Sequence, residues 1–314
     1  MSGGAGFLDT VAGLRDVAAR QCGVVARSQL TRLGVTSDAV DHQVRARRWR
    51  RTSRDVVVLH RGPLTRAARC WVAVLGAPAG AALGAWTALE LRGLTGWDRE
   101  PLHVVIARGQ RADRHPWLVV HESRRPATGD VGVVAGLPVH DVARAAVDAA
   151  AWQPSWRTAS GLVAAVVQQR LATPAVLLAK LDEVGAVRHR ATVRLALADI
   201  AGGADSLAEI DFARLCRRAG LPEPARQSRR RDSTGRWRYL DVEWRARGRR
   251  LVVEVDGVGH LESRRWYDDL LRDAELGADT RTVRLRLPAM AARREPERVL
   301  AVVHRHLADL MLAA

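Results

Sequence analysis

Residues 236–256 read RWRYLDVEWRARGRRLVVEVD, and this stretch decides the fold expected for the C-terminal part of the chain. β-Branched and aromatic residues dominate Arg236–Trp244 and Arg250–Val255, between polar turns, which predicts two strands. The connection over residues 245–249 is short and contains a glycine, so the two strands should pair as an antiparallel hairpin. The sequence therefore predicts a β-hairpin that carries carboxylates.

The register of this hairpin determines which carboxylates meet. Pairing Trp244 with Leu251 sets the register, and Asp241 then lies directly opposite Glu254. Two opposed carboxylates repel each other, and an unpaired charge within the apolar run around Glu254 costs several kcal/mol. A bound Mg²⁺ or Mn²⁺ would relieve both costs. Ion pairs are the alternative explanation, because residues 226–250 contain ten arginines.

Three segments of residues 206–290 carry a family resemblance. They are Tyr239-Leu-Asp-Val-Glu-Trp244, Leu251-Val-Val-Glu-Val-Asp-Gly-Val-Gly-His260 and Asp269-Leu-Leu-Arg272. Together they resemble a restriction-endonuclease-like PD-(D/E)xK family that is related to very-short-patch-repair endonucleases. The resemblance implies an α/β core with a mixed sheet over residues 206–314. It also implies that Asp241 and Glu254 bind the catalytic metal ion.

The resemblance extends to further residues of this region. It implies that Asp256 stands at the position of the motif lysine and that His260 is the histidine after the Asp-Gly pair. It also implies a polar helix pair, Asp269 and Arg272, and a closing strand at Val283–Leu285. The family's relatives that lack the lysine rely on histidine, which implies the same for this chain, whose only lysine is Lys180.

Three of these residues have two interpretations each. His260 has the intrinsic pKa of a general base or water-orienting group, but it could equally be a capping or core histidine. Asp256 could bind a second metal ion or a water beside it, or end the strand in an Asp-Gly turn. Glu209 could add a carboxylate from the first helix, or close a capping box with Ser206, which we favour.

The N-terminal region, residues 1–60, has the order helix, helix, helix, hairpin. The expected elements are Leu8–Arg20, Ser28–Leu33, Asp38–Trp49 and Asp55–Leu59, with a break near Gly34. This order is typical of a winged helix-turn-helix, whose third helix contacts DNA. Six arginines with no acidic residue among them suit phosphate contacts, although a solvated basic surface is the alternative. They are Arg45, Arg47, Arg48, Arg50, Arg51 and Arg54.

The middle of the chain is expected to form an α+β module over residues 61–150 and a helical connector over 151–205. The module has predicted helices at Arg66–Leu75 and Gly84–Leu94, and predicted strands at Leu102–Ala107 and Trp117–His121. Residues 87–94, 102–106 and 136–139 resemble the body of the antitoxin of type IV abortive-infection toxin–antitoxin systems. The connector has predicted helices at Ala175–Val184 and Ala191–Ile200. The glycine-containing residues 201–205 are the expected boundary before the last domain.

The overall composition indicates a polyanionic partner. The net charge of +16 and the pI near 11.4 come almost entirely from arginine, which binds phosphate in a bidentate manner. DNA is the expected partner, with RNA and a homodimer left open. Three scattered cysteines without a C-x-x-C spacing, and an N-terminus without a secretory pattern, fit a reducing cytoplasm. The uncharged residues 70–89 contain Pro78 and several glycines, which favours two buried helices over a membrane span.

These patterns favour a metal-dependent DNA endonuclease that an N-terminal DNA-binding domain directs to duplex DNA. The alternative is a DNA-binding transcriptional regulator, similar to an antitoxin, with an inactive nuclease-like domain that could serve in dimerisation.

Overall fold

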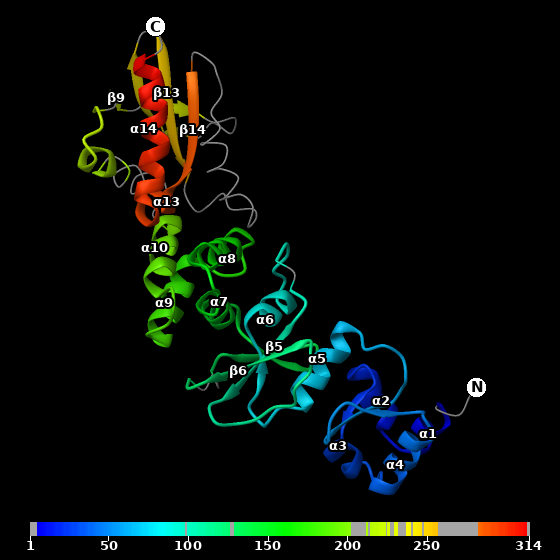
Figure 1. The fold of residues 1–314 in the computed structure, drawn as a ribbon. Helices are drawn as coiled ribbons and strands as arrows, with labels where there is room; N and C mark the ends of the chain where they lie inside the picture. The colour runs from blue at the N-terminus through cyan, green and yellow to red at the C-terminus, as the bar shows by residue number, and fades with distance from the viewer. Residues whose placement is uncertain are drawn as a thin grey trace. The chain divides into compact units, whose positions relative to one another are not determined.

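The computed structural model of the chain describes most of the molecule. The described residues are 5–97, 99–125, 129–201, 212, 214–223, 225–226, 229–231, 237–239, 241–246, 248–256 and 282–312. The chain divides into two compact units, Met1–Asp148 and Ala149–Ala314. Both units mix helices with sheets, which agrees with the expected α+β class (Figure 1).

The first part of the N-terminal unit contains four helices and a three-stranded antiparallel sheet with the order β1-β3-β2. Its elements are α1 (Ala5–Thr10), α2 (Leu14–Arg20), β1 (Val24–Ala26), α3 (Arg27–Arg32), α4 (Ser37–Arg45), β2 (Arg50–Arg51) and β3 (Val56–Val58). Leu14, Leu30, Val40 and Trp49 fill the core that these elements share.

Two boundaries in this part differ from the sequence prediction. The helix expected from Leu8 to Arg20 is two helices, because Gly13 between them has a φ of +78°. The helix expected to reach Trp49 ends at Arg45, and Arg47 then adopts a φ of +54°. Thr36 caps this helix, since its hydroxyl accepts a hydrogen bond from the Ala39 amide at 3.2 Å.

The second part of the N-terminal unit is a five-stranded mixed sheet with the order β6-β5-β4-β8-β7. Its elements are α5 (Arg66–Leu75), β4 (Ala82–Leu83), α6 (Ala85–Leu91), β5 (Leu102–Ala107), β6 (Leu118–Ser123), β7 (Val131–Val134), β8 (Leu137–His140) and α7 (Val142–Ala151). The helix 66–75 and the strand 102–107 agree with the prediction to the residue. The uncharged residues 70–89 form a helix, a short strand and a second helix.

The C-terminal unit begins with helices and ends with a sheet. The helices are α8 (Trp156–Gln168), α9 (Pro174–Val184) and α10 (Arg190–Ala201). Helix α10 packs on both α8 and α9, and the last two helices match the predicted ranges within one residue. Ser155 and Thr173 cap α8 and α9 with their hydroxyl groups.

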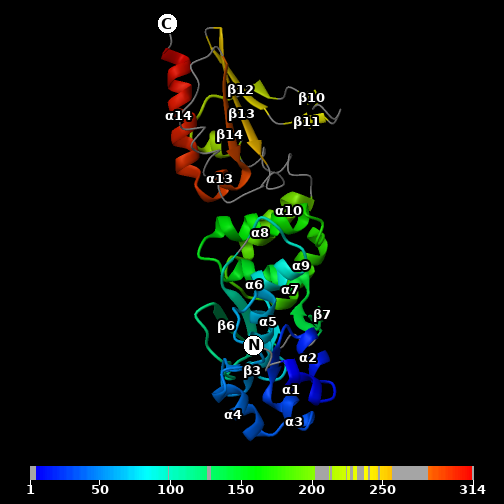
Figure 2. The same ribbon diagram turned by 90° about the vertical axis from the view of Figure 1, so that its right-hand side faces the viewer.

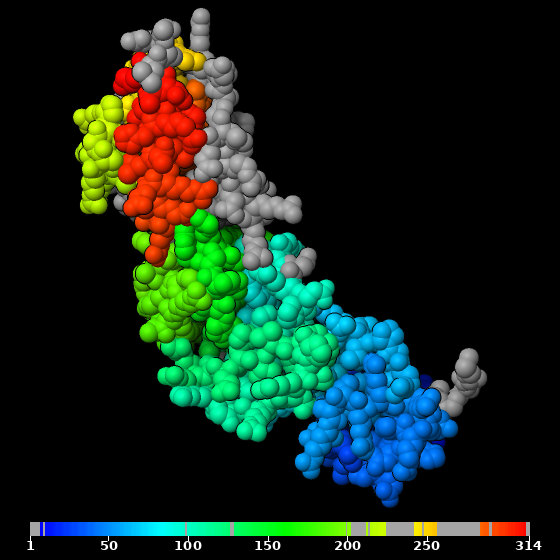
Figure 3. Space-filling model, viewed as in Figure 1, coloured from blue at the N-terminus to red at the C-terminus, as the bar shows by residue number. Residues whose placement is uncertain are grey.

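The four-stranded sheet of this unit is mixed, with the order β14-β13-β12-β9. Its strands are β9 (Ala225–Arg226), β12 (Asp241–Ala246), β13 (Arg249–Asp256) and β14 (Thr282–Pro288), followed by α13 (Ala289–Arg294) and α14 (Pro296–Leu312). Helix α14 runs along one face of the sheet (Figure 2), and its outer side is open to solvent (Figure 3).

The single strand predicted over Arg236–Trp244 is wrong, because the structure has two strands in this range. Residues 237–239 form β11, which pairs with β10 (Arg229–Arg231) in a separate two-stranded sheet. Only β12, from Asp241 onward, belongs to the four-stranded sheet. Charged residues alternate with apolar or aromatic residues on both sides of Leu240, so this pattern contains no indication of the division.

Candidate functional site

The hairpin of β12 and β13 has the predicted register. Trp244 pairs with Leu251, and Asp241 pairs with Glu254. The connection between the strands includes Gly248, whose φ of +75° is accessible to glycine at little cost. The two carboxylate-bearing positions are therefore direct neighbours on adjacent strands.

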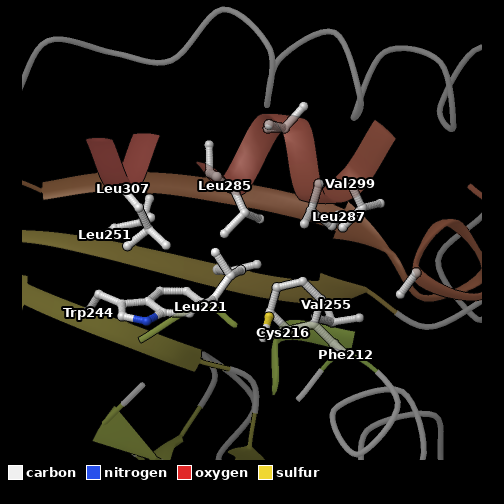
Figure 4. Close-up of a cluster of buried hydrophobic side chains, with 14 of the residues drawn as sticks. Phe212, Cys216, Leu221, Trp244, Leu251, Val255, Leu285, Leu287, Val299 and Leu307 are labelled. Carbon is white, nitrogen blue, oxygen red and sulfur yellow. The ribbon is translucent and has the colours of Figure 1, made fainter. Parts of the chain in front are cut away.

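The two faces of the sheet differ sharply in character. One face contributes apolar side chains to the C-terminal core, where they meet Val299 and Leu307 of α14 (Figure 4). The sheet residues in this core are Trp244, Leu251, Val253, Val255, Leu285 and Leu287. Because side chains alternate along a strand, the intervening residues belong to the opposite face. These are the charged positions 241, 243, 245, 250, 254, 256, 284 and 286, together with Val252.

Glu254 forms ion pairs across the sheet with two arginines of β14. Its Oε2 lies 3.2 Å from Arg286 Nε, and its Oε1 lies 3.7 Å from Arg284 Nη1. The parallel pairing of β13 with β14 places Arg286 directly beside Glu254. Arginine pairing was expected as an alternative to metal binding, but from residues 226–250. The described pairs come instead from a strand that lies much later in the sequence.

Glu243 is the second described carboxylate of this face, and its environment is closed. It is 8% exposed and accepts two hydrogen bonds from Arg245, at 2.8 Å from Nε and 2.9 Å from Nη2. Arg250 lies further away, with its Nε 3.8 Å from Oε1. The hydrogen bond to Glu243 raises the pKa of the Arg245 guanidinium. The sequence prediction gave Glu243 no role, although the period-two alternation that places Asp241 on this face places Glu243 there as well.

The other predicted site residues are described in part or not at all. The backbone register places Asp256 beside Pro288 of β14, two residues after Glu254 and on the same face. The predicted residues Glu209, His260, Asp269 and Arg272 lie outside the described residues. Within the described ranges, no three His, Cys, Asp or Glu residues are close enough together to hold a metal ion.

The six predicted DNA-contacting arginines surround the end of α4 and the hairpin of β2 and β3. All are exposed except Arg50, which is half-buried and donates a hydrogen bond to the Gly62 carbonyl at 2.8 Å. Arg51 forms an ion pair with Asp41 of α4, and Arg48 donates a hydrogen bond to the Gln43 side chain at 3.2 Å. Three of the six arginines therefore already have partners within the N-terminal unit.

Comparison with known proteins adds no family to this description. No protein-family model and no curated protein matches the chain. Among the described residues, no helix has both the length and the apolar character that crossing a bilayer requires.

Proposed function

We propose that this chain is a metal-dependent DNA endonuclease whose polar sheet face hydrolyses phosphodiester bonds. The observation that carries this proposal is the direct pairing of Asp241 with Glu254. Opposed like charges destabilise a sheet that has only a structural role, so their presence calls for a bound cation or a chemical use. Asp256 adds a third carboxylate position on the same face of β13.

The chemistry of these donors fits a divalent cation such as Mg²⁺ or Mn²⁺. Carboxylate oxygens are the ligands that these hard cations prefer. The Glu254 side chain is 22% exposed, and its ion pairs at 3.2 and 3.7 Å are longer than the about 2.7–2.9 Å of a tight charge-assisted hydrogen bond. Glu254 is therefore open to a stronger partner. When bound, such a cation lowers the pKa of its water and stabilises charge on the phosphate.

Each of the predicted site residues then has a separate role in the proposed reaction. Asp241 and Glu254 hold the cation, and His260 accepts or directs the proton of the attacking water. Asp256 stands where the nucleases that this region resembles carry a lysine, and Asp269 and Arg272 support the site. Lys180 forms an ion pair with Glu183 on α9 at 2.7 Å, so it is engaged within its own helix.

Delivery to DNA is assigned to the N-terminal domain. Its helices α3 and α4, followed by the β2–β3 hairpin, support a winged helix-turn-helix assignment. Exposed arginines at the end of α4 and in the hairpin suit phosphate contacts on both sides of a groove.

A DNA-binding regulator is the second candidate, and a specific observation favours it. Both described glutamates of the polar face already have arginine partners. In this alternative the sheet is a charged structural surface, and the N-terminal arginines alone carry the function.

Plasmid nicking tests the two candidates. The purified chain is incubated with supercoiled plasmid and Mg²⁺ or Mn²⁺, beside Glu254→Ala and the control Glu297→Ala. Glu297 is an exposed carboxylate in the first turn of α14. We expect nicking by the wild type and the control, and a loss of about 100-fold or more in Glu254→Ala. Equal nicking by both variants, or none by the wild type, would sink the nuclease proposal. Salt-sensitive DNA binding without cleavage would support the regulator.

A further inference from the structure

Strand β14 presents two arginines in a fixed direction. Its sequence alternates apolar and basic residues, and Leu285 and Leu287 are fully buried in the C-terminal core. Their burial fixes the orientation of the strand, so Arg284 and Arg286 must lie on the polar face. This direction is set by the core and does not depend on the ion pairs.

The ion pairs that Arg284 and Arg286 make with Glu254 stabilise the fold only slightly. Their side chains are 55% and 58% exposed, so about half of each remains in water while reaching Glu254. Ion pairs this exposed contribute little to folding stability. Both arginines lie within 4 Å of the Glu254 carboxylate.

The polar face carries four arginines against four carboxylate positions. The arginines are Arg245, Arg250, Arg284 and Arg286, and the carboxylate positions are 241, 243, 254 and 256. A cation bound at Glu254 would repel the neighbouring guanidinium groups and release them from the carboxylate. A phosphate oxygen beside that cation is the natural new partner, because guanidinium binds phosphate through two parallel N–H groups.

We propose that Arg284 and Arg286 bind the backbone phosphate of nucleic acid next to Glu254, in place of the positive charge that a motif lysine would supply. This inference rests on the proposed function and names further residues of the same site. Both arginines stay protonated, so they stabilise charge on the phosphate and take no proton from water.

The salt dependence of DNA binding tests this assignment without relying on cleavage. The full-length chain and its variants bind a fluorescent duplex at a fixed Ca²⁺ concentration, so that a divalent cation can occupy the carboxylates, and the binding constant is followed against salt concentration. Each lost phosphate contact should reduce the slope of log K against log salt by about one. We expect a reduction of about one for Arg286→Ala and about two for Arg284→Ala/Arg286→Ala. Arg305→Ala, an exposed residue of α14, should leave the slope unchanged.

A second pair of variants separates phosphate binding from a structural role. In EDTA, where no cation occupies the site, Glu254→Gln removes the charge that holds both arginines, so it should steepen the slope relative to the wild type. Adding Arg284→Ala/Arg286→Ala to Glu254→Gln should cancel that gain. A lower melting temperature with an unchanged slope would overturn the inference, as would equal slopes in all variants. A wild type that never nicks plasmid while these slopes change would instead refute the nuclease proposal alone.

Discussion

Arg144 is the most deeply buried charge in the described part of the N-terminal unit. It is 3% exposed, and its guanidinium lies 2.9 Å from Asp130 Oδ2 and 2.9 Å from Asp148 Oδ2. Removing one partner of a buried pair leaves uncompensated charge and costs about 3–5 kcal/mol. We therefore expect Arg144→Met to lower the unfolding free energy of this unit by that amount, as measured by urea denaturation.

The exposed ion pair between Arg51 and Asp41 provides the control for Arg144. Its side chains are about two-fifths exposed, so Arg51→Ala should cost less than about 1 kcal/mol. Similar losses of unfolding free energy in Arg144→Met and Arg51→Ala would contradict the claim that burial makes the ion pairs of Arg144 more important for stability.

Single residues also show how far the candidate site could be predicted. Glu254 was predicted as a site residue because a charged residue inside an apolar strand can be recognised from the sequence alone. Its partners Arg284 and Arg286 were missed, because strand β14 meets β13 only through a long-range parallel pairing. The i,i+4 spacing of Arg144 and Asp148 was visible in the sequence, but burial was not. In a chain this rich in arginine, composition does not distinguish a buried arginine from a solvated one.

At the scale of elements, two histidines join the neighbouring strands β5 and β6. Nδ1 of His103 lies 2.9 Å from Nε2 of His121, and the rings stack. Burial lowers the pKa of both imidazoles to about 4. The unfolded chain, with histidine near about 6.5, binds more protons between these values. The unfolding free energy of this unit should therefore fall as the pH drops from about 6.5 to about 4.

Replacing the histidine pair tests this pH dependence. His103→Gln/His121→Gln should reduce the loss of stability between pH 7 and pH 4 by roughly 1–3 kcal/mol. His140, whose pKa burial also lowers to about 4, retains part of the effect. Urea midpoints at several pH values give the measurement, with Val119→Ala on β6 as a control without a titratable group. An unchanged pH profile in the double variant would exclude the pair as the source.

Elements with strong local patterns were predicted, and elements that depend on tertiary pairing were not. The β12–β13 register followed from turn length and alternation, and both are local properties. The strands β1 and β4 have three and two residues and were missed, because strands this short exist only through their neighbours. The hairpin of β7 and β8 was also missed, although its pairing is local.

At the scale of the whole molecule, the division into two units falls inside α7, between Asp148 and Ala149. No proline or glycine marks this point, so composition gives no indication of it. The boundary expected at residues 201–205 stays a prediction, since 202–205 lie outside the described residues. Charge patterning predicted the positions of the basic cluster and the carboxylate hairpin, because both are local features.

Each unit has its own apolar core, which predicts two separable unfolding transitions. One core is built around Leu14 and Trp49, and the other includes Leu287 and Val303. Arg144→Met should lower one transition only. Leu287→Ala removes a buried side chain and should lower the other by about 2–5 kcal/mol. Differential scanning calorimetry of the full chain and both variants measures the two transitions. A single transition that shifts with either variant would mean that the two units unfold as one cooperative body.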